Sequence, residues 1–338
     1  MIKIKVTCKA GLVENFSRML PDGRVIDNVR FYFEDEDQNI EYDYWLVLHA
    51  SGLQNIETSM CAKERIIYVS FEADERISGA VKKFLSQFHV VFSCDDKLKN
   101  PVKVNLSLQH WWVGMKVKFK NGSHVISKDC SLNYHSLSEP VKVSKLDRIS
   151  IILSNRDVIP GHSRRRAYVD KLLESRVGEF IDIYGPDFNP IEDKWDALVQ
   201  YKYHISIENV VKDNYWTEKL VDSMLAECLT FYLGCPNIFD YFPKDSCIPI
   251  TYEDDVEAAV LLIEQALESG LYEKRLSSLL KGKHAALNGN NLFFVIARQC
   301  NKALDTKKII TLYPNSFLSN PFKYMAKQLL AFCGIHRN

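Results

Sequence analysis

The sequence has no paired-cysteine motif and no long hydrophobic run. Its nine cysteines are scattered without a CxxC pair, and their number is odd, which argues against a zinc ribbon and against a disulfide framework. Apolar runs such as IDNVRFYF and NLFFVIA fall short of the roughly 18 to 20 residues that a membrane-spanning helix needs. We therefore predict buried thiols in a reducing compartment and no transmembrane helix.

A net charge and a metal-ligand pattern are also missing, and we expect no leader sequence. Lysine plus arginine equals aspartate plus glutamate at 43 each, so nothing in the overall charge indicates a nucleic-acid partner. The histidines show no HxH or HExxH spacing, and the acidic run EDEDQ is interpreted as solvated charge, so we expect no metal site and no required cofactor. The N-terminal MIKIKVTCKAG alternates like a strand and lacks the features of a signal peptide, which predicts a cytoplasmic protein.

What the chain does contain is an alternation of strand and helix patterns over 338 residues, enough for two domains of about 150 residues. From residue 149 onward the order is ISIILSN, a helix at about 162–174, EFIDIYG, YHISIEN, a helix at about 217–227, and LTFYLG. This order predicts right-handed βαβ units and a parallel sheet. Weaker signals of the same kind come earlier: MIKIKVTC, DYWLVLHA, RIIYVSFEA, the helix ISGAVKKFLSQF, and HVVFSCD.

We therefore predict an α/β protein with two Rossmann-like domains, 1–145 and 146–338. The boundary is placed in the polar stretch NYHSLSEPVKVSKLD, where the periodicity fades and Pro140 interrupts the pattern. After about residue 253 the spacing of apolar residues becomes helical, so the second domain is expected to end in helices.

The stretch YWTEKLVDSMLAECLTFYLGCPNIFDYFP places a cation where a helix repels one. Thr217 is a good N-cap, so Lys219 falls in the first turn and opposes the helix dipole by a few tenths to about 1 kcal/mol. A bound phosphate would resolve the conflict, because backbone N–H groups and the ammonium would share one anion. The alternative is a surface lysine beside Glu218 or Asp222.

Two further candidate sites lie where predicted strands end. SNRDVIPGHSRRRAYVDKL passes a Pro-Gly loop and enters a helix with Arg164, Arg165 and Arg166 in its first turn, which suits a diphosphate gripped by guanidinium groups. YHISIEN puts Glu208 and Asn209 at the carboxyl edge of a parallel strand, where open α/β sheets bind ligands. The alternatives are a solvated basic helix face and a turn with an exposed acid.

Together these residues resemble glycosyltransferase family 10, the α-1,3/4-fucosyltransferases. Residues 201–250 are similar to the family's C-terminal signature: Y-K-F-x-x-x-x-E-N, then a tyrosine and T-E-K, then G-x-P-x-x-x-x-F-x-P. Upstream, LSNRDVIPGHSRRRAYVDKL and IDIYG resemble the family's arginine-helix and second-strand segments, so the resemblance covers roughly residues 149 to 268. GPDFNPIEDKWDAL and KFLSQFHVVFSCD are similar to bacterial members found with surface-polysaccharide genes.

The resemblance implies a GT-B fold, with two Rossmann-like domains facing across a cleft, the first on the acceptor side and the second holding the nucleotide sugar. It implies that Glu218 hydrogen-bonds the ribose, that Lys219 and Arg165 neutralise the diphosphate, and that Asn209 and Tyr215 line the donor pocket. Fixed cations would then stabilise the departing nucleoside diphosphate without a metal. The full expected donor site is Arg164, Arg165, Glu208, Asn209, Tyr215, Thr217, Glu218 and Lys219.

Inverting transfer also needs a base that takes the proton of the acceptor hydroxyl. The family places a glutamate just after a strand of the N-terminal domain, in a G-E-N-like context, and YVSFEADERI offers Glu72 there, with Glu75 as the alternative base. Phe71 and Ala73 depart from that context, so an ordinary solvated carboxylate is the competing interpretation of Glu72.

The leading prediction is an inverting glycosyltransferase that moves L-fucose from GDP-fucose onto a free or lipid-linked glycan in bacterial surface polysaccharide or lipopolysaccharide synthesis. A different nucleotide-sugar donor, or a glycan- or nucleotide-binding protein without catalysis, remains the alternative. Trp111 and Trp112 are expected either to form a sugar platform on the acceptor side or to belong to the core. Lys323 and Lys327 suggest peripheral contact with the inner face of a membrane.

Overall fold

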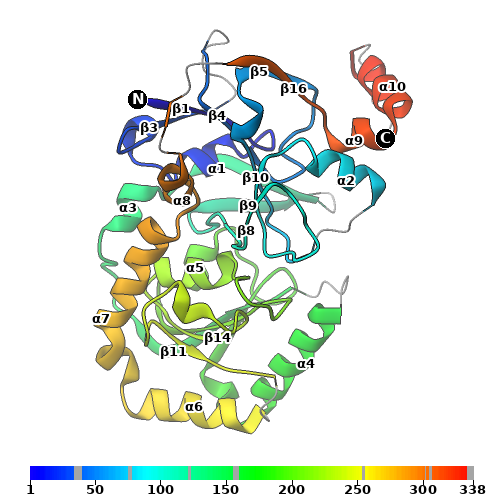
Figure 1. Cartoon of the computed structure of the whole chain (residues 1–338). Coiled ribbons are helices and arrows are strands. Elements are labelled where there is room, and N and C mark those ends of the chain that lie inside the picture. Colours follow the sequence, from blue (N-terminus) through cyan, green and yellow to red (C-terminus); the bar gives the residue numbers. More distant parts are fainter. Residues whose placement is uncertain are drawn as a thin grey trace. The chain divides into compact units, whose positions relative to one another are not determined.

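The chain folds into two α/β units in a computed structural model that describes residues 1–33, 40–74, 78–120, 123–154, 160–252, 256–300, 302–303 and 307–332 (Figure 1). The N-terminal unit combines Met1–Val13, Asp22–Leu108 and Ile296–Asn338, and the C-terminal unit combines Glu14–Pro21 and Gln109–Val295. This division differs from the boundary predicted at residue 145, because residues 109–145 group with the C-terminal sheet and the last stretch of chain groups with the N-terminal sheet.

The N-terminal unit is built on a seven-stranded sheet with the order β2-β3-β1-β4-β6-β7-β8. Its neighbouring strands are parallel, except that β2 runs antiparallel to β3. Large side chains such as Trp45, Tyr68 and Phe84 pack together in its core. The strands are β1 (Ile2–Thr7), β2 (Val25–Ile26), β3 (Val29–Phe33), β4 (Tyr44–Leu48), β6 (Ile66–Val69), β7 (Val90–Phe92) and β8 (Val102–Val104), and α2 (Gly79–Leu85) lies between β6 and β7 in the chain.

The C-terminal stretch of the chain completes this unit. β16 (Lys308–Leu312) pairs antiparallel with β5 (Glu57–Cys61), a contact between segments some 250 residues apart that no local pattern signals. It leads into α9 (Asn315–Ser319) and α10 (Pro321–Phe332). In the described part of the chain, no helix is both long and apolar enough to cross a membrane.

The C-terminal unit is built on a five-stranded sheet with the order β12-β11-β13-β14-β15, in which every pair is parallel. One face packs against residues of α4, α6 and α7. The strands are β11 (Leu146–Ile152), β12 (Ile181–Tyr184), β13 (Tyr201–Ile207), β14 (Leu229–Leu233) and β15 (Cys247–Pro249), and the helices α4 (Pro160–Glu174), α5 (Glu218–Leu225), α6 (Val256–Glu268) and α7 (Leu271–His284). The predicted strand and helix order is confirmed.

The remaining elements are the hairpin β9 (Met115–Lys120) and β10 (Ser123–Cys130), α1 (Val13–Ser17), α3 (Tyr134–Ser138), the short turn η4 (Lys194–Ala197) and α8 (Leu292–Gln299). Arg18 ties the segment after α1 to the hairpin region by donating to the carbonyl oxygens of Trp111, Val113 and Leu132 at 2.7 to 2.9 Å. Each unit is built on a parallel or mostly parallel sheet, so the predicted α/β class with two Rossmann-like domains is confirmed.

Candidate functional site

The C-terminal sheet changes its direction of winding between two neighbouring strands. β11 leads through α4 to β12 on one side, whereas β13 leads through α5 to β14 on the other. Ligands of open α/β sheets bind outside the carboxyl ends of the strands at such a reversal. A cavity of about 1410 Å³ opens at this place and is lined by residues of β11, β13, α4, α5, η4 and the β9–β10 hairpin.

The first turns of α4 carry a buried arginine into this cavity. Arg165 is 7% exposed and lies on the same helix face as the buried Tyr168, Val169 and Leu172, at the i, i+3, i+4, i+7 spacing of an inward face. Its Nη1 donates to Asn209 Oδ1 at 2.9 Å, and its Nε has no hydrogen-bond partner among the described residues. Burial lowers the pKa of Arg165, and the opposing attraction of Tyr252, Glu208 and Glu218 does not offset the lost hydration.

A glycine lets α4 come this close to the end of β13. A Cβ atom on Gly161 would lie 1.9 Å from the carbonyl oxygen of Asn209, so any side chain there would push the helix start away from the strand end. The sequence Pro160-Gly161 thus does two things, since proline begins the helix and glycine permits the contact. The result places Arg165 beside Asn209.

The start of α5 is organised by a carboxylate that does not line the cavity. Glu208 is buried at the end of β13, where its Oε1 accepts from the Thr217 N–H at 2.9 Å and its Oε2 accepts from Lys219 Nζ at 3.0 Å. Thr217 Oγ1 donates to Glu208 and caps the helix by accepting from the Lys219 N–H at 3.3 Å. Glu208 and Thr217 therefore position Lys219, and the lysine lines the cavity.

The ion pair with Glu208 thus offsets the unfavourable interaction between Lys219 and the positive end of the helix dipole. Burial acts to lower the pKa of Lys219, but the charges of Glu208 and Glu218 outweigh it and raise that pKa. Lys219 is charged and partly accessible, with one side held by protein and the other facing the cavity.

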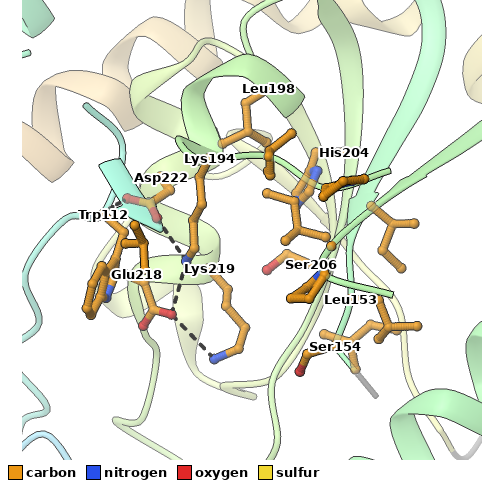
Figure 2. Close-up of a pocket in the computed structure, with 18 of the residues that line it drawn as sticks. Trp112, Leu153, Ser154, Lys194, Leu198, His204, Ser206, Glu218, Lys219 and Asp222 are labelled. Atoms are coloured by element: carbon orange, nitrogen blue, oxygen red, sulfur yellow. Dashed lines mark hydrogen bonds and ion pairs between the residues drawn. The ribbon is translucent and has the colours of Figure 1, made fainter. Parts of the chain in front are cut away.

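A second lysine, Lys194 of η4, bridges two acids on α5. Its Nζ lies 3.3 Å from Glu218 Oε1 and 3.2 Å from Asp222 Oδ2, as the dashed lines in Figure 2 show. Asp222 also accepts from the backbone N–H of Trp112 at 2.8 Å. Burial opposes the charged form of Glu218, but Lys219 and Lys194 hold its pKa well below the usual range, so it is ionised at neutral pH.

The opposite wall of the cavity is the sheet itself. His204 and Ser206 of β13 and Ser154 after β11 face Lys194 and Lys219 across the open space in Figure 2. The His204 Nδ1 is 2.9 Å from Ser150 Oγ, and burial together with the charge of Lys194 lowers the pKa of His204 to about 3. The imidazole is therefore neutral at physiological pH.

The structure brings five of the predicted residues to the cavity and leaves others outside it. Arg165, Asn209, Glu218, Lys219 and Trp112 line it. Arg164 is exposed, with its guanidinium 4.0 Å over the ring of Tyr252, and does not line the cavity. Of the two alternatives for Trp111, the structure has the second, because this residue is buried in the core. Tyr215 is buried and, like Glu208 and Thr217, is not among the residues that line the cavity.

The predicted base lies in the N-terminal unit. Glu72 follows β6, has a side chain that is 59% exposed, and its Oε1 is 3.7 Å from Nε2 of His49, which follows the neighbouring parallel strand β4. Asp74 is paired with Lys97 at 3.0 Å. Glu75, the alternative base, lies outside the described residues.

Two cavity residues, Lys194 and Asp222, have roles that sequence reasoning missed. A signal for them was present, since Glu218 and Asp222 are like charges at i, i+4 on one helix and need a cation between them. That the cation comes from η4, more than 20 residues upstream, depends on how the chain returns to the sheet.

Chemically, the arrangement combines fixed cations, a buried guanidinium and neutral polar groups in one cavity. Such a site can hold an anion with a polar organic part and stabilise negative charge that develops on it. Within the described residues, no group of three or more histidine, cysteine or acidic side chains is placed to hold a metal ion.

No family model matches the chain. A fucosyltransferase-like protein of Arabidopsis thaliana is 38% identical over 66 residues, which are 19% of this chain and 13% of that protein. GDP-fucose protein O-fucosyltransferase 3 of Mus musculus is 33% identical over 101 residues, 28% of this chain and 21% of that protein. The chain thus spans less than a quarter of either curated relative. A crystal structure of an alpha1,3-fucosyltransferase with GDP is 17% identical with a TM-score of 0.49, covering 90% of this chain and 91% of that chain.

Proposed function

We propose that this chain is a glycosyltransferase whose cavity between β11 and β13 holds a nucleoside diphosphate sugar. The observation that carries the proposal is Arg165, a buried guanidinium whose Nε lacks a partner among the described residues and whose Nη1 reaches only a neutral amide in the bonds described. A buried charge left in this state costs several kcal/mol unless a counter-ion is supplied. A diphosphate supplies it, because phosphate oxygens accept guanidinium N–H groups in pairs.

The other cavity cations fit the same ligand. Lys219 offers its accessible side to the anion, while its Nζ is held by Glu208 at 3.0 Å. In glycosyl transfer the nucleoside diphosphate leaves with growing negative charge, so cations fixed in advance stabilise the transition state more than the ground state. The volume of about 1410 Å³ exceeds the usual range for small-molecule sites and accommodates a nucleotide and its sugar together.

The donor we propose is GDP-fucose, transferred with inversion. Support comes from the local sequence similarity to two proteins with fucosyltransferase names and from the signature-like residues 201–250. For the proton of the acceptor hydroxyl we propose Glu72, an exposed carboxylate at the carboxyl edge of the N-terminal sheet. The similarity of residues 185–198 to bacterial members supports a surface polysaccharide or lipopolysaccharide glycan as the acceptor.

Binding of GDP is expected to raise the thermal stability of the purified protein, and GDP-fucose to raise it further. A ligand that binds only the folded state stabilises it by about 2.7 kcal/mol at a hundredfold excess over its dissociation constant. The measurement is the melting temperature with GDP, UDP, ADP and CMP and with their sugar conjugates. A shift with UDP alone would mean that the donor is a uridine sugar, and no shift with any nucleotide would overturn the proposal.

The proposed acceptor includes lipid-linked glycans, and α10 offers a surface for a membrane. Its residues Phe322, Met325 and Leu329 recur at i, i+3 and i+7 and are 87%, 56% and 64% exposed. The other side is fixed, since Tyr324 packs on Phe317 of α9. Lys323 and Lys327 flank the apolar stripe, and residues 314–332 contain no acid, which is the charge pattern of a helix that lies on an anionic lipid surface.

Replacing Phe322, Met325 and Leu329 with alanine is expected to weaken binding to vesicles containing phosphatidylserine by at least about tenfold, because each side chain loses apolar burial in the lipid. Co-sedimentation with vesicles measures it. The matched control is the triple alanine variant of Leu261, Leu262 and Leu280, which are exposed on α6 and α7. Equal losses in the two triple variants, or equal binding to neutral vesicles, would contradict the expectation.

A further inference from the structure

One wall of the cavity carries polar side chains where a central strand normally carries apolar ones. β13 lies between β11 and β14, so both of its edges are hydrogen-bonded to neighbouring strands. On one face Tyr203, Ile205 and Ile207 join the core with α4 and α6, as expected of a buried parallel strand. On the other face, at the alternate positions, stand His204 and Ser206, which line the cavity.

The hydroxyl of Ser206 lacks the hydrogen-bond partner that a buried polar group normally has. Ser206 is 2% exposed, and its Oγ has no hydrogen-bond partner among the described residues. A buried hydroxyl without a partner destabilises a protein by about 1 to 3 kcal/mol, so natural sequences seldom keep one without a use. An alanine at this position would fill the same place in the strand without the penalty.

His204, two residues before it, presents the same kind of group. Its Nδ1 is occupied by Ser150 Oγ at 2.9 Å, which leaves Nε2 as the ring nitrogen for a ligand. The ring is neutral, because burial and Lys194 hold its pKa near 3. A neutral imidazole and a hydroxyl form hydrogen bonds with uncharged polar groups, whereas the phosphates find their cations at Arg165 and Lys219.

Apolar side chains also line this cavity, alongside the charged Lys194, Glu218 and Asp222. Met115 and Val117 of β9, Ile191 and Leu198 line it together with Trp112. A sugar would leave many hydroxyl groups unpaired against such walls, whereas a nucleobase has apolar faces and polar groups only along its edge. Ser206 lies within β13, whereas Asn209, which accepts from Arg165, lies beyond the end of that strand, so a ligand that reaches both Ser206 and Arg165 must be extended.

We infer that His204 and Ser206 form the recognition site for the nucleobase of the donor, with hydrogen bonds from Nε2 and Oγ to the base edge. The inference rests on the proposed function, because it needs a nucleoside diphosphate with its phosphates at Arg165 and Lys219. It also agrees with the chemistry of transfer, since the base belongs to the leaving group and can be enclosed, whereas the sugar must stay open to the acceptor.

Ser206→Ala tests the inference by isothermal titration with GDP and with inorganic diphosphate. We expect GDP to bind about threefold to tenfold more weakly, the value of one neutral hydrogen bond, and inorganic diphosphate to bind as in the wild type. Free Ser206→Ala should melt at the same temperature as the wild type or higher, because the hydroxyl it loses has no partner among the residues that the structure describes. Ser175→Ala, at the end of α4 and outside the cavity, is the control.

A second variant tests the role of His204 and keeps an aromatic ring in its place. Ser150→Ala with His204→Phe keeps a ring at position 204 and removes both partners of the existing hydrogen bond, so neither is left unsatisfied. It should bind GDP, UDP and ADP with more similar dissociation constants than the wild type does. Equal weakening of GDP and inorganic diphosphate in Ser206→Ala, or unchanged discrimination in the double variant, would overturn the inference and leave the diphosphate site standing. Failure of the wild type to bind either ligand would instead overturn the proposed function.

Discussion

Arg165→Met is expected to lower kcat for sugar transfer by about 10²- to 10³-fold and to weaken GDP binding by at least about thirtyfold. The first figure is the usual effect of removing one fixed group that stabilises transition-state charge, and the second follows from losing a buried charge partner worth 2 kcal/mol or more. Steady-state kinetics with GDP-fucose and titration with GDP provide the two numbers.

The same variant should not lose stability when no ligand is bound. In the free protein Arg165 is a buried cation that donates to a neutral amide, and burial lowers its pKa. Methionine has a similar length and no charge to desolvate, so the melting temperature of the free variant should equal or exceed that of the wild type. A residue present only for structure would show the opposite, with lower stability and intact binding.

Arg164→Met is the matched control for this pair of effects. It removes the same kind of side chain from the adjacent position of α4, but Arg164 is exposed and lies over Tyr252 outside the cavity. Turnover and GDP binding should stay within about threefold of the wild type, since a cation–π contact at an exposed site is worth about 0.5 to 1 kcal/mol. Loss of GDP binding in Arg164→Met with retention in Arg165→Met would reverse our assignment.

Glu72→Gln is expected to lower the rate of transfer by about 10²- to 10⁴-fold and to leave GDP binding unchanged. The range is the usual contribution of a positioned general base, and glutamine keeps the size of the side chain while removing its basicity. Nucleotide binding should persist because the residues proposed for it belong to the C-terminal unit. The assay follows GDP release in the presence and absence of a glycan acceptor, together with the melting shift caused by GDP.

Asp74→Asn is the control for the base, because it neutralises a second acid of the same loop that is already paired with Lys97. Its turnover should remain close to that of the wild type. If Glu72→Gln retains turnover and Glu75→Gln loses it, the base is Glu75. If the wild type binds GDP-fucose and transfers nothing to any acceptor tried, the chain is a binding protein and neither residue acts as a base.

Much of the C-terminal unit could be predicted from the sequence alone, because the signals are local. β-branched runs and helical spacing predicted β11, α4, β12, β13, α5 and β14 in the observed order, and Thr217 was recognised as the cap of α5. The inward spacing of Arg165 with Tyr168, Val169 and Leu172 is likewise a property of the sequence. Such features depend on residues within a few turns or a few strand positions of each other, so the local pattern of apolar and polar residues is enough to predict them.

The tertiary structure decided which of these residues meet. Glu208 had the sequence position of a ligand-binding acid, yet folding turned it onto Thr217 and Lys219. The antiparallel pairing of β5 with β16 joins segments that share no sequence pattern. It helps to explain why the unit boundary differs from the predicted one. In the sequence Ser206 is an ordinary strand residue. That its hydroxyl lines a cavity, with no partner among the described residues, depends on how η4 and the β9–β10 hairpin pack over the sheet. Contacts of this kind depend on the packing of distant segments, which local propensity does not encode.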